Sequence, residues 1–170
     1  MDKNSLRKWA KEKRKNLDMA KISTILSSKL VQTNEYKSSK NIMIFYPLEN
    51  EVNLLSLLSD HSKQFYLPRI VNSELECCAY NLGDELCQSK FHTKEPTCKA
   101  CSKTNIDTVI VPALAVDTNK YRLGYGGGFY DRFLKDFSGQ KIVCIPSELI
   151  VDSVYPESHD IKMDLIIHSK

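Results

Sequence analysis

The sequence predicts an α/β fold, a layered domain in which a largely parallel central sheet is flanked by helices. Short apolar runs of strand length alternate along the chain with segments whose apolar residues recur at helical spacing. The most strand-like run, residues 108–116, is apolar throughout, as expected of a strand covered on both faces. Because the chain contains no repeat and no interdomain linker, residues 1–170 are expected to form a single domain.

Two helices are expected at the start of the chain. Leu6, Trp9 and Ala10 lie near one face of the first helix, whose other faces are basic, and Leu17 follows two turns later. Apolar residues at the same spacing predict a second helix at about residues 18–36.

The remaining elements follow in chain order. Strands are expected at residues 41–48, 65–70, 75–80, 108–116, 141–145 and 163–168, and helices at 52–58 and 129–137. The strand at 108–116 is expected in the middle of the sheet. The polar segment 81–105 has no clear period and is expected to be a loop with room for one short strand.

The basic charge of the chain is concentrated at one end. Residues 1–15 carry seven lysines and arginines against two acidic residues, a local charge of +5, whereas the rest of the chain is near −2. A nucleic-acid partner is disfavoured because this charge is not spread over a face, and a compact anionic ligand is favoured. Apart from two residues discussed below, the basic side chains are expected at the surface: Lys8, Lys11, Lys13, Arg14 and Lys15.

Neither a membrane span nor a secretory signal is expected. The longest apolar stretch, residues 109–116, is far shorter than the roughly 18–20 residues of a transmembrane helix. No apolar block of the kind found in signal peptides precedes Lys11. We therefore expect a cytoplasmic protein without a membrane partner, whose six cysteines stay reduced.

Cys98 and Cys101 form a CxxC pair, a spacing that occurs in zinc and redox sites. No second CxxC and no HxxxH pair follows at zinc-finger spacing, so an ordinary loop is favoured. A zinc- or RNA-binding module is the less favoured alternative, and it rests on the cysteines and the basic N-terminal segment.

The clearest functional signal is the glycine-rich segment at residues 122–131, where four of the six glycines fall within five residues. Glycine admits backbone angles closed to other residues and allows a ligand to approach the main chain. Exposed amides before a helix start would bind phosphate or another anion. The segment is neither a Walker A loop, which needs Lys-Ser or Lys-Thr, nor GxGxxG, because Phe129 stands where glycine is required.

Residues 111–117 and 121–132 strongly resemble the signature of the 5-formyltetrahydrofolate cyclo-ligase family, also called 5,10-methenyltetrahydrofolate synthetases. The resemblance covers nearly the whole chain and extends to residues 3–7, 45–53, 67–68, 95–96, 159–160 and 164. Ala113, Val116 and His168 depart from the usual family residues, but none of these departures removes a charged or glycine position of the expected site.

The resemblance implies an ATP-dependent ligase that converts 5-formyltetrahydrofolate to 5,10-methenyltetrahydrofolate and releases ADP and phosphate. ATP phosphorylates the formyl oxygen to an imidoyl phosphate, nitrogen 10 attacks the activated carbon, and phosphate leaves with the help of Mg²⁺. Such chemistry depends on positioning and charge neutralisation more than on a protein nucleophile. A sugar-phosphate or acyl-CoA enzyme of similar architecture is the alternative. The expected partner is a small-molecule folate, and the expected assembly is a monomer, with a dimer as the alternative.

The resemblance also implies roles for individual residues. The expected nucleotide-binding residues are Lys3, Asn4, Ser5, Leu6, Arg7, Arg122, Leu123, Gly124, Tyr125, Gly126, Gly127, Gly128, Phe129 and Tyr130. The expected folate-binding residues are Tyr46, Glu51, Tyr125, Gly126, Gly127, Gly128 and Phe129. Arg122 and Tyr130 are the expected catalytic residues. Asp131 and Asp160 are the expected Mg²⁺ ligands, with Asp117 and Asp164 as weaker candidates.

Some of these residues also have an ordinary structural explanation on the sequence alone. Lys3 and Arg7 fit a solvent-exposed basic helix face, and Asp131 fits an acidic residue that complements a helix dipole. The aromatic candidates fit a hydrophobic core. Glu51 is a stronger candidate because it follows the end of an expected strand, where ligands of α/β proteins collect.

Overall fold

The central sheet has six strands in the order β11-β9-β6-β1-β2-β3. The computed structural model describes residues 1–170. The strands are β1 (Asn41–Met43), β2 (Gln64–Val71), β3 (Glu74–Tyr80), β6 (Thr108–Ile110), β9 (Gln140–Ile145) and β11 (Leu165–His168). All neighbouring strands are parallel except the hairpin β2–β3. The predicted α/β fold with a largely parallel sheet is confirmed.

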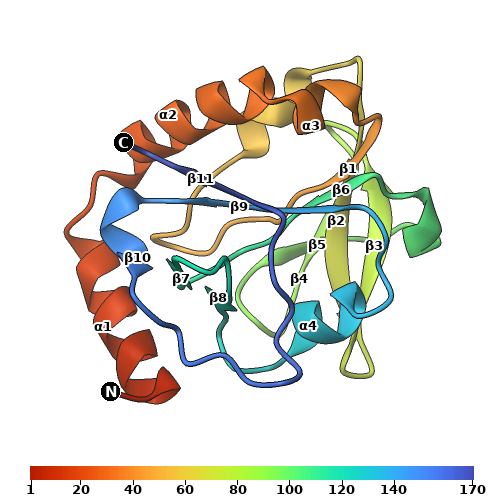
Figure 1. Ribbon diagram of the computed structural model, residues 1–170. Helices are drawn as coiled ribbons and strands as arrows, with labels where there is room; N and C mark the ends of the chain where they lie inside the picture. The colour runs from red at the N-terminus through yellow and green to blue at the C-terminus, as the bar shows by residue number, and fades with distance from the viewer.

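Helices cover both faces of this sheet (Figure 1). α2 (Met19–Gln32) and α3 (Asn34–Ser38) lie on one face, and α1 (Lys3–Lys15) and α4 (Phe129–Leu134) on the other. Side chains of a strand alternate between faces. In β9, Ile142 packs in one core cluster with Leu26 of α2, and Val143 packs in the other with Leu6 of α1. The central strands are therefore apolar at consecutive positions.

The apolar run predicted as one strand at residues 108–116 is two strands. Its first part, β6, lies in the middle of the central sheet as predicted. Its second part enters a small sheet of β7 (Ala115–Asp117), β8 (Arg122–Leu123) and β10 (Ile150–Val151), in the order β10-β7-β8. Pro112 lies at the break. Proline has no N–H to donate to a ladder, and so the chain leaves the central sheet at this point.

Other predicted elements are shorter than expected. The helix at 18–36 divides at Thr33, whose hydroxyl accepts a hydrogen bond from the N–H of Tyr36 and caps α3. The strand at 41–48 forms sheet pairs only at 41–43. A helix was predicted at residues 52–58, but the structure has only a 3₁₀ turn, at Leu55–Ser59. A segment this short forms too few hydrogen bonds to offset the cost of nucleating an α-helix. α4 ends three residues before the predicted end at 137.

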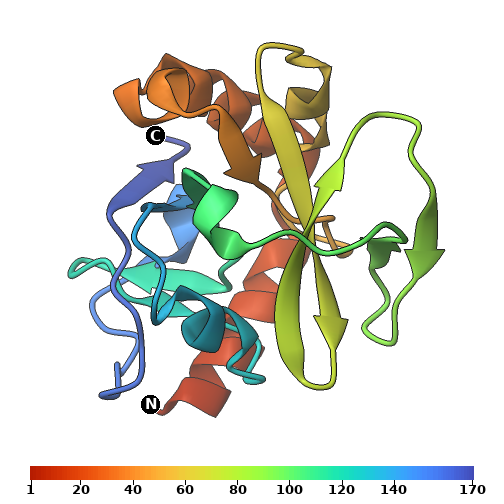
Figure 2. The same ribbon diagram turned by 90° about the vertical axis from the view of Figure 1, so that its right-hand side faces the viewer.

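The segment 81–105, predicted as a loop, contains a second hairpin. Its strands are β4 (Leu86–Gln88) and β5 (Lys94–Pro96), which pair with each other and project from the side of the molecule (Figure 2).

None of the helices combines the length and the apolar character needed to cross a membrane.

One basic residue of α1 does not lie where the charge pattern predicted it. Arg14 was expected at the surface but is only 4% exposed. Its guanidinium donates to the carbonyl oxygen of Ala113 and, at 3.3 Å, to that of Asn50. Arg14 faces inward because it lies on the same side of α1 as Leu6 and Ala10. The basic face of α1 is therefore interrupted by one buried charge.

Candidate active site

A cavity of about 610 Å³ brings together segments that are far apart in the sequence. Its wall contains most of the residues expected to bind ligands: Lys3, Arg7, Tyr46, Glu51, every residue from 122 to 131, and Asp160. The first turn of α1, the loop after β1, the glycine-rich loop and the segment before β11 thus meet at one place.

Three residues expected to bind nucleotide do not line this cavity. Leu6 is 5% exposed and packs in the hydrophobic core. The N–H of Ser5 donates to Asp2, the residue that caps α1. The amide oxygen of Asn4 accepts a hydrogen bond from Nη1 of Arg7 at 2.8 Å. Asn4 therefore reaches the cavity through Arg7 and not by its own side chain.

The glycine-rich loop, residues 124–128, joins β8 to α4 and adopts a backbone that requires glycine. Gly126 has φ +111° and Gly128 has φ +70°, in the region that other residues rarely adopt. A Cβ atom on Gly127 would lie 2.5 Å from the ring of Phe129. The glycines consequently contribute only main-chain atoms to the cavity wall, and the side chains of Arg122, Phe129 and Arg132 pack closely against them.

Two arginines fix the loop through its carbonyl groups. Nε of Arg7 donates to the carbonyl oxygen of Gly124 at 2.9 Å, and Nη1 of Arg132 donates to that of Gly127 at 2.9 Å. Because carbonyl oxygens would repel an anion, their engagement by cations makes the loop more favourable for phosphate.

Arg122 is a buried cation in the cavity wall, with only 5% of its side chain exposed. Nη1 donates to the carbonyl oxygen of Pro112 at 3.0 Å, Nη2 lies 3.7 Å from Oδ1 of Asp131, and the guanidinium lies 5.5 Å from the ring centre of Tyr130. Nε has no hydrogen-bond partner. Burial lowers the pKa of Arg122 and raises that of Tyr130, but a guanidinium stays charged near neutral pH. The wall therefore presents a fixed positive charge.

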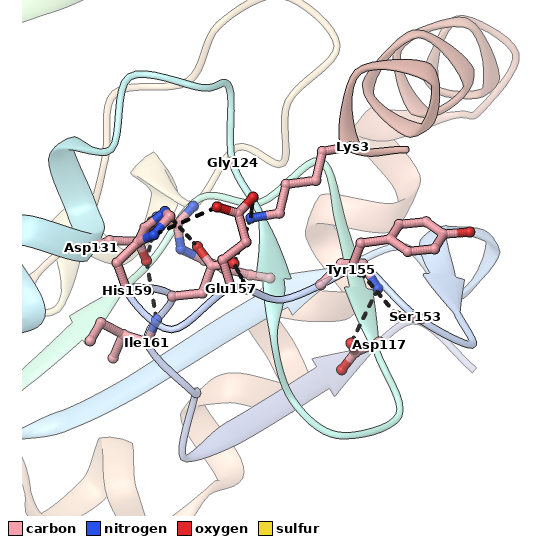
Figure 3. A network of polar contacts seen from close by, with 12 residues as sticks. Lys3, Asp117, Gly124, Asp131, Ser153, Tyr155, Glu157, His159 and Ile161 are labelled. Atoms are coloured by element: carbon pink, nitrogen blue, oxygen red, sulfur yellow. Dashed lines mark hydrogen bonds and ion pairs between the residues drawn. The ribbon is translucent and has the colours of Figure 1, made fainter. Parts of the chain in front are cut away.

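Lys3 and Asp160 form an ion pair in the wall of the cavity. Nζ of Lys3 lies 2.6 Å from Oδ2 of Asp160. It also lies 3.3 Å from Oε1 of Glu157 (Figure 3). Burial opposes ionisation of Asp160. The hydrogen bonds from Lys3 and from the N–H of Glu157 outweigh that effect, and the pKa of Asp160 lies below its ordinary value.

Of the four candidate metal ligands, only Asp131 and Asp160 line the cavity. Asp117 lies apart from Asp131 (Figure 3). Its carboxylate accepts hydrogen bonds from the N–H groups of three residues, which are Asn119, Tyr121 and Val154. Asp164 accepts from the N–H of Lys141. Asp117 and Asp164 therefore stabilise turns and strand ends.

The donor chemistry of Asp131 and Asp160 suits Mg²⁺, which is usually held by one or two carboxylates together with phosphate oxygens and water. No group of three or more His, Cys, Asp or Glu side chains is placed to share a metal ion. Both carboxylates are paired with a cation, Asp131 with Arg122 and Asp160 with Lys3. Phosphate ligands would therefore have to complete any such site.

Glu51 is a buried carboxylate in the wall, 7% exposed. Oε1 accepts a hydrogen bond from the N–H of Leu48 at 2.7 Å, and Oε2 accepts one from the hydroxyl of Tyr125 at 3.1 Å. Burial raises the pKa of Glu51, whereas these two hydrogen bonds and the charge of Arg14 act in the opposite direction. A carboxylate beside aromatic rings suits a flat ligand with N–H donors.

The β4–β5 hairpin supplies part of the wall that sequence reasoning missed, residues 90–95. The rings of Phe91 and Phe129 meet edge to face, with centres 5.6 Å apart. The hydroxyl of Thr93 donates to the carbonyl oxygen of Tyr46 at 3.0 Å. The match at Glu95 and Pro96 was the only signal in the sequence that pointed to this segment.

The cysteines of the CxxC pair lie outside the cavity wall. Cys98 is exposed and its thiol donates to the carbonyl oxygen of Ala79, while the main chain of Cys101 pairs with Cys77. Cys98 and Cys101 thus lie alongside β3 and contact its residues Ala79 and Cys77.

Comparison with known proteins connects this site to one family. Residues 1–169 match the model of the 5-formyltetrahydrofolate cyclo-ligase family. The NMR structure of 5,10-methenyltetrahydrofolate synthetase from Aquifex aeolicus is 30% identical, with a TM-score of 0.89 over 100% of this chain and 91% of that one. A synthetase of the same name from Mycoplasma pneumoniae is 25% identical, with a TM-score of 0.81 and full coverage of both chains. The mouse 5-formyltetrahydrofolate cyclo-ligase is 24% identical over 86% of this chain and 81% of its own length.

Proposed function

Since the chain belongs to the 5-formyltetrahydrofolate cyclo-ligase family, we propose that it converts 5-formyltetrahydrofolate to 5,10-methenyltetrahydrofolate at the expense of ATP. One observation carries the proposal: the glycine-rich loop at residues 124–128, the buried Arg122 and the buried Glu51 line the same cavity. A phosphate site and a site for N–H donors are thus adjacent, as transfer of a phosphoryl group to a folate requires.

The glycine-rich loop and three cations bind the triphosphate of ATP. Amide groups of residues 124–128 donate to phosphate oxygens, and Arg122 supplies a fixed charge next to them. Lys3 and Arg7 extend from the first turn of α1 into the same cavity. Their spacing of four residues places both side chains on one face of the helix.

The reduced pterin lies near Glu51, Tyr125 and Phe129. The carboxylate of Glu51 accepts hydrogen bonds from N–H donors at the edge of the ring, and the aromatic side chains contact the flat faces of the ligand. Tyr46 and residues 90–95 of the β4–β5 hairpin also line the cavity, and Phe91 packs against Phe129.

In the reaction, the formyl oxygen of the folate attacks the terminal phosphorus of ATP and ADP leaves. Nitrogen 10 then attacks the activated carbon and gives up its proton to solvent, and the bond between that carbon and the phosphorylated oxygen breaks to release phosphate. Arg122 neutralises charge on the transferred group, and Tyr130 packs against its guanidinium and keeps it in place.

Asp131 and Asp160 would hold a Mg²⁺ ion together with phosphate oxygens of ATP. A bound Mg²⁺ neutralises negative charge on the phosphate oxygens. Asp131 also accepts a hydrogen bond from the N–H of Ile161, at 3.3 Å, which orients its carboxylate and links α4 to the segment that carries Asp160.

The proposed reaction is tested by mixing the purified protein with Mg-ATP and 5-formyltetrahydrofolate. We expect the methenyl chromophore to form together with one ADP and one phosphate. Absence of the chromophore under conditions in which a known cyclo-ligase produces it would refute the proposal.

We further propose a monomer that acts in the cytoplasm without a nucleic-acid partner. Its six free cysteines suit a reducing compartment, and sedimentation in solution tests the assembly.

A further inference from the structure

We propose that Arg14 is a positioning residue for the folate site, which holds the main chain at Asn50 and at Ala113 and so keeps the Glu51 carboxylate directed into the cavity. The inference rests on the proposed function, because it concerns the residue assigned to the pterin. Arg14 itself does not line the cavity.

The hydrogen bonds of Arg14 join two segments of the cavity wall. One guanidinium nitrogen donates to the carbonyl oxygen of Ala113, next to Pro112 in the wall, and the other donates to that of Asn50, next to Glu51. Asn50 has φ +63°, a conformation that is uncommon for a residue other than glycine. The buried guanidinium of Arg14 donates to the carbonyl oxygen of Asn50 and so offsets the cost of this conformation. The conformation in turn directs the side chain of Glu51 into the cavity.

Arg14 and Arg122 hold adjacent carbonyl groups of the same turn. Nη1 of Arg122 donates to Pro112 and Arg14 donates to Ala113, at the point where the chain leaves the central sheet. Carbonyl groups that have left a ladder need other partners when they are buried. The turn is thus held by one cation from the phosphate side of the cavity and one from the folate side.

The charge of Arg14 also acts on Glu51. The charged and titratable groups that act on Glu51 are Arg14 from α1, Tyr125 from the glycine-rich loop and Tyr130 from α4. Arg14 is the only cation among them. Burial raises the pKa of Glu51, and the positive charge of Arg14 lowers it. Without Arg14 the carboxylate would therefore be protonated at higher pH.

Direct measurement of folate binding tests this role. We expect Arg14→Met to raise the Kd for 5-formyltetrahydrofolate by about tenfold or more, the size expected when the charge-assisted contact proposed between Glu51 and the folate is lost. The affinity for ATP should change less than about twofold. As the pH falls, the folate affinity of the variant should decrease at a higher pH than that of the wild type, because the pKa of Glu51 is higher without the charge of Arg14.

A double-mutant cycle with Glu51→Gln separates positioning from general destabilisation. If Arg14 acts through Glu51, Arg14→Met should have little further effect on the folate Kd in the Glu51→Gln protein. Additive effects of the two substitutions would overturn the inference, as would an unchanged pH profile. Lys8→Met, which removes the same charge from the exposed face of α1, is the matched control and should leave both affinities unchanged.

Arg14→Lys keeps the experiment informative if Arg14→Met does not fold. Lysine retains the charge but loses the second donor group, so this variant should keep the pH profile of the wild type and bind folate more weakly. Wild-type affinity in Arg14→Lys would refute the need for two carbonyl contacts. Failure of the wild-type protein to form the methenyl product would instead refute the proposed function, so the two failures are distinguishable.

Discussion

Nζ of Lys3, in the first turn of α1, lies 2.6 Å from Oδ2 of Asp160, 157 residues further along the chain. The pair lines the cavity in which the triphosphate of ATP is proposed to bind. Because the wall at this point depends on both ends of the chain, the site is complete only when α1 has packed against the central sheet.

Lys3→Gln is expected to raise the KM for ATP by about tenfold, since one charge-assisted contact to phosphate is lost. The KM for 5-formyltetrahydrofolate should change little. Steady-state kinetics with each substrate varied in turn provides the measurement. Lys8→Gln on the exposed face of the same helix is the control, and an equal effect of both substitutions would contradict the assignment.

The same variant should also alter stability at acid pH. The pKa of Asp160 is depressed in the folded protein, so its ionisation stabilises the fold above the unfolded pKa of about 3.9, and this contribution is lost as pH falls through the folded pKa. Without Lys3 that contribution becomes smaller. Urea unfolding at neutral pH and at about pH 3 should show a smaller difference for Lys3→Gln than for the wild type.

Glu51→Gln should weaken folate binding much more than ATP binding, and at the same time stabilise the fold at neutral pH. The pKa of Glu51 is raised by burial, so its effect on stability is most favourable below the unfolded pKa of about 4.3 and is lost as pH rises through the folded pKa. Because glutamine carries no charge, the Glu51→Gln variant should not lose stability as the pH rises to neutral. Isothermal titration with each ligand and thermal unfolding from about pH 5 to pH 8 test both parts. Equal losses of folate and ATP affinity would refute the assignment.

Gly126→Ala should abolish nucleotide binding through the backbone. A Cβ atom at this position would make only ordinary contacts with Arg7, but φ of +111° is strained for alanine at a cost of about 1–3 kcal/mol. Gly83→Ala is a matched control, because Gly83 has φ +92°, open surroundings and no place in the cavity wall. Both variants should lose stability in urea. Only Gly126→Ala should lose affinity for ATP.

Arg122→Met should reduce the rate of methenyl formation below detection. It should also destabilise the protein by about 1–3 kcal/mol, because the carbonyl group of Pro112 loses its buried donor. The rate is followed by absorbance and the stability by urea unfolding. Substantial activity in a folded Arg122→Met protein would exclude this residue from phosphoryl transfer.

The parts of the fold that follow from local pattern could be predicted from the sequence. The apolar residues of β9 and of the β2–β3 hairpin form strands at the predicted places, and the glycine-rich segment lies in a cavity wall. The division of residues 108–116 was missed because both halves are apolar, and only tertiary packing separates them into two sheets.

Arg14 illustrates why part of the site could not be predicted. Within a run of basic residues, nothing local distinguishes the one side chain that turns inward, because its partners are main-chain carbonyl groups 36 and 99 residues away. The hairpin residues 90–95 were missed for a related reason. Their composition is that of a polar loop, and they reach the cavity only through contacts such as that between Phe91 and Phe129.

The β4–β5 hairpin has a consequence for how enzymes of this kind can diverge. Its two strands pair with each other, outside the six-stranded sheet, and its residues are mostly exposed. Exchanges at its tip therefore change side chains that line the cavity, such as Phe91 beside Phe129, without altering the pairing of the six-stranded sheet. We therefore expect that transplanting this one segment between homologues changes ligand preference more than it changes the stability of the central sheet.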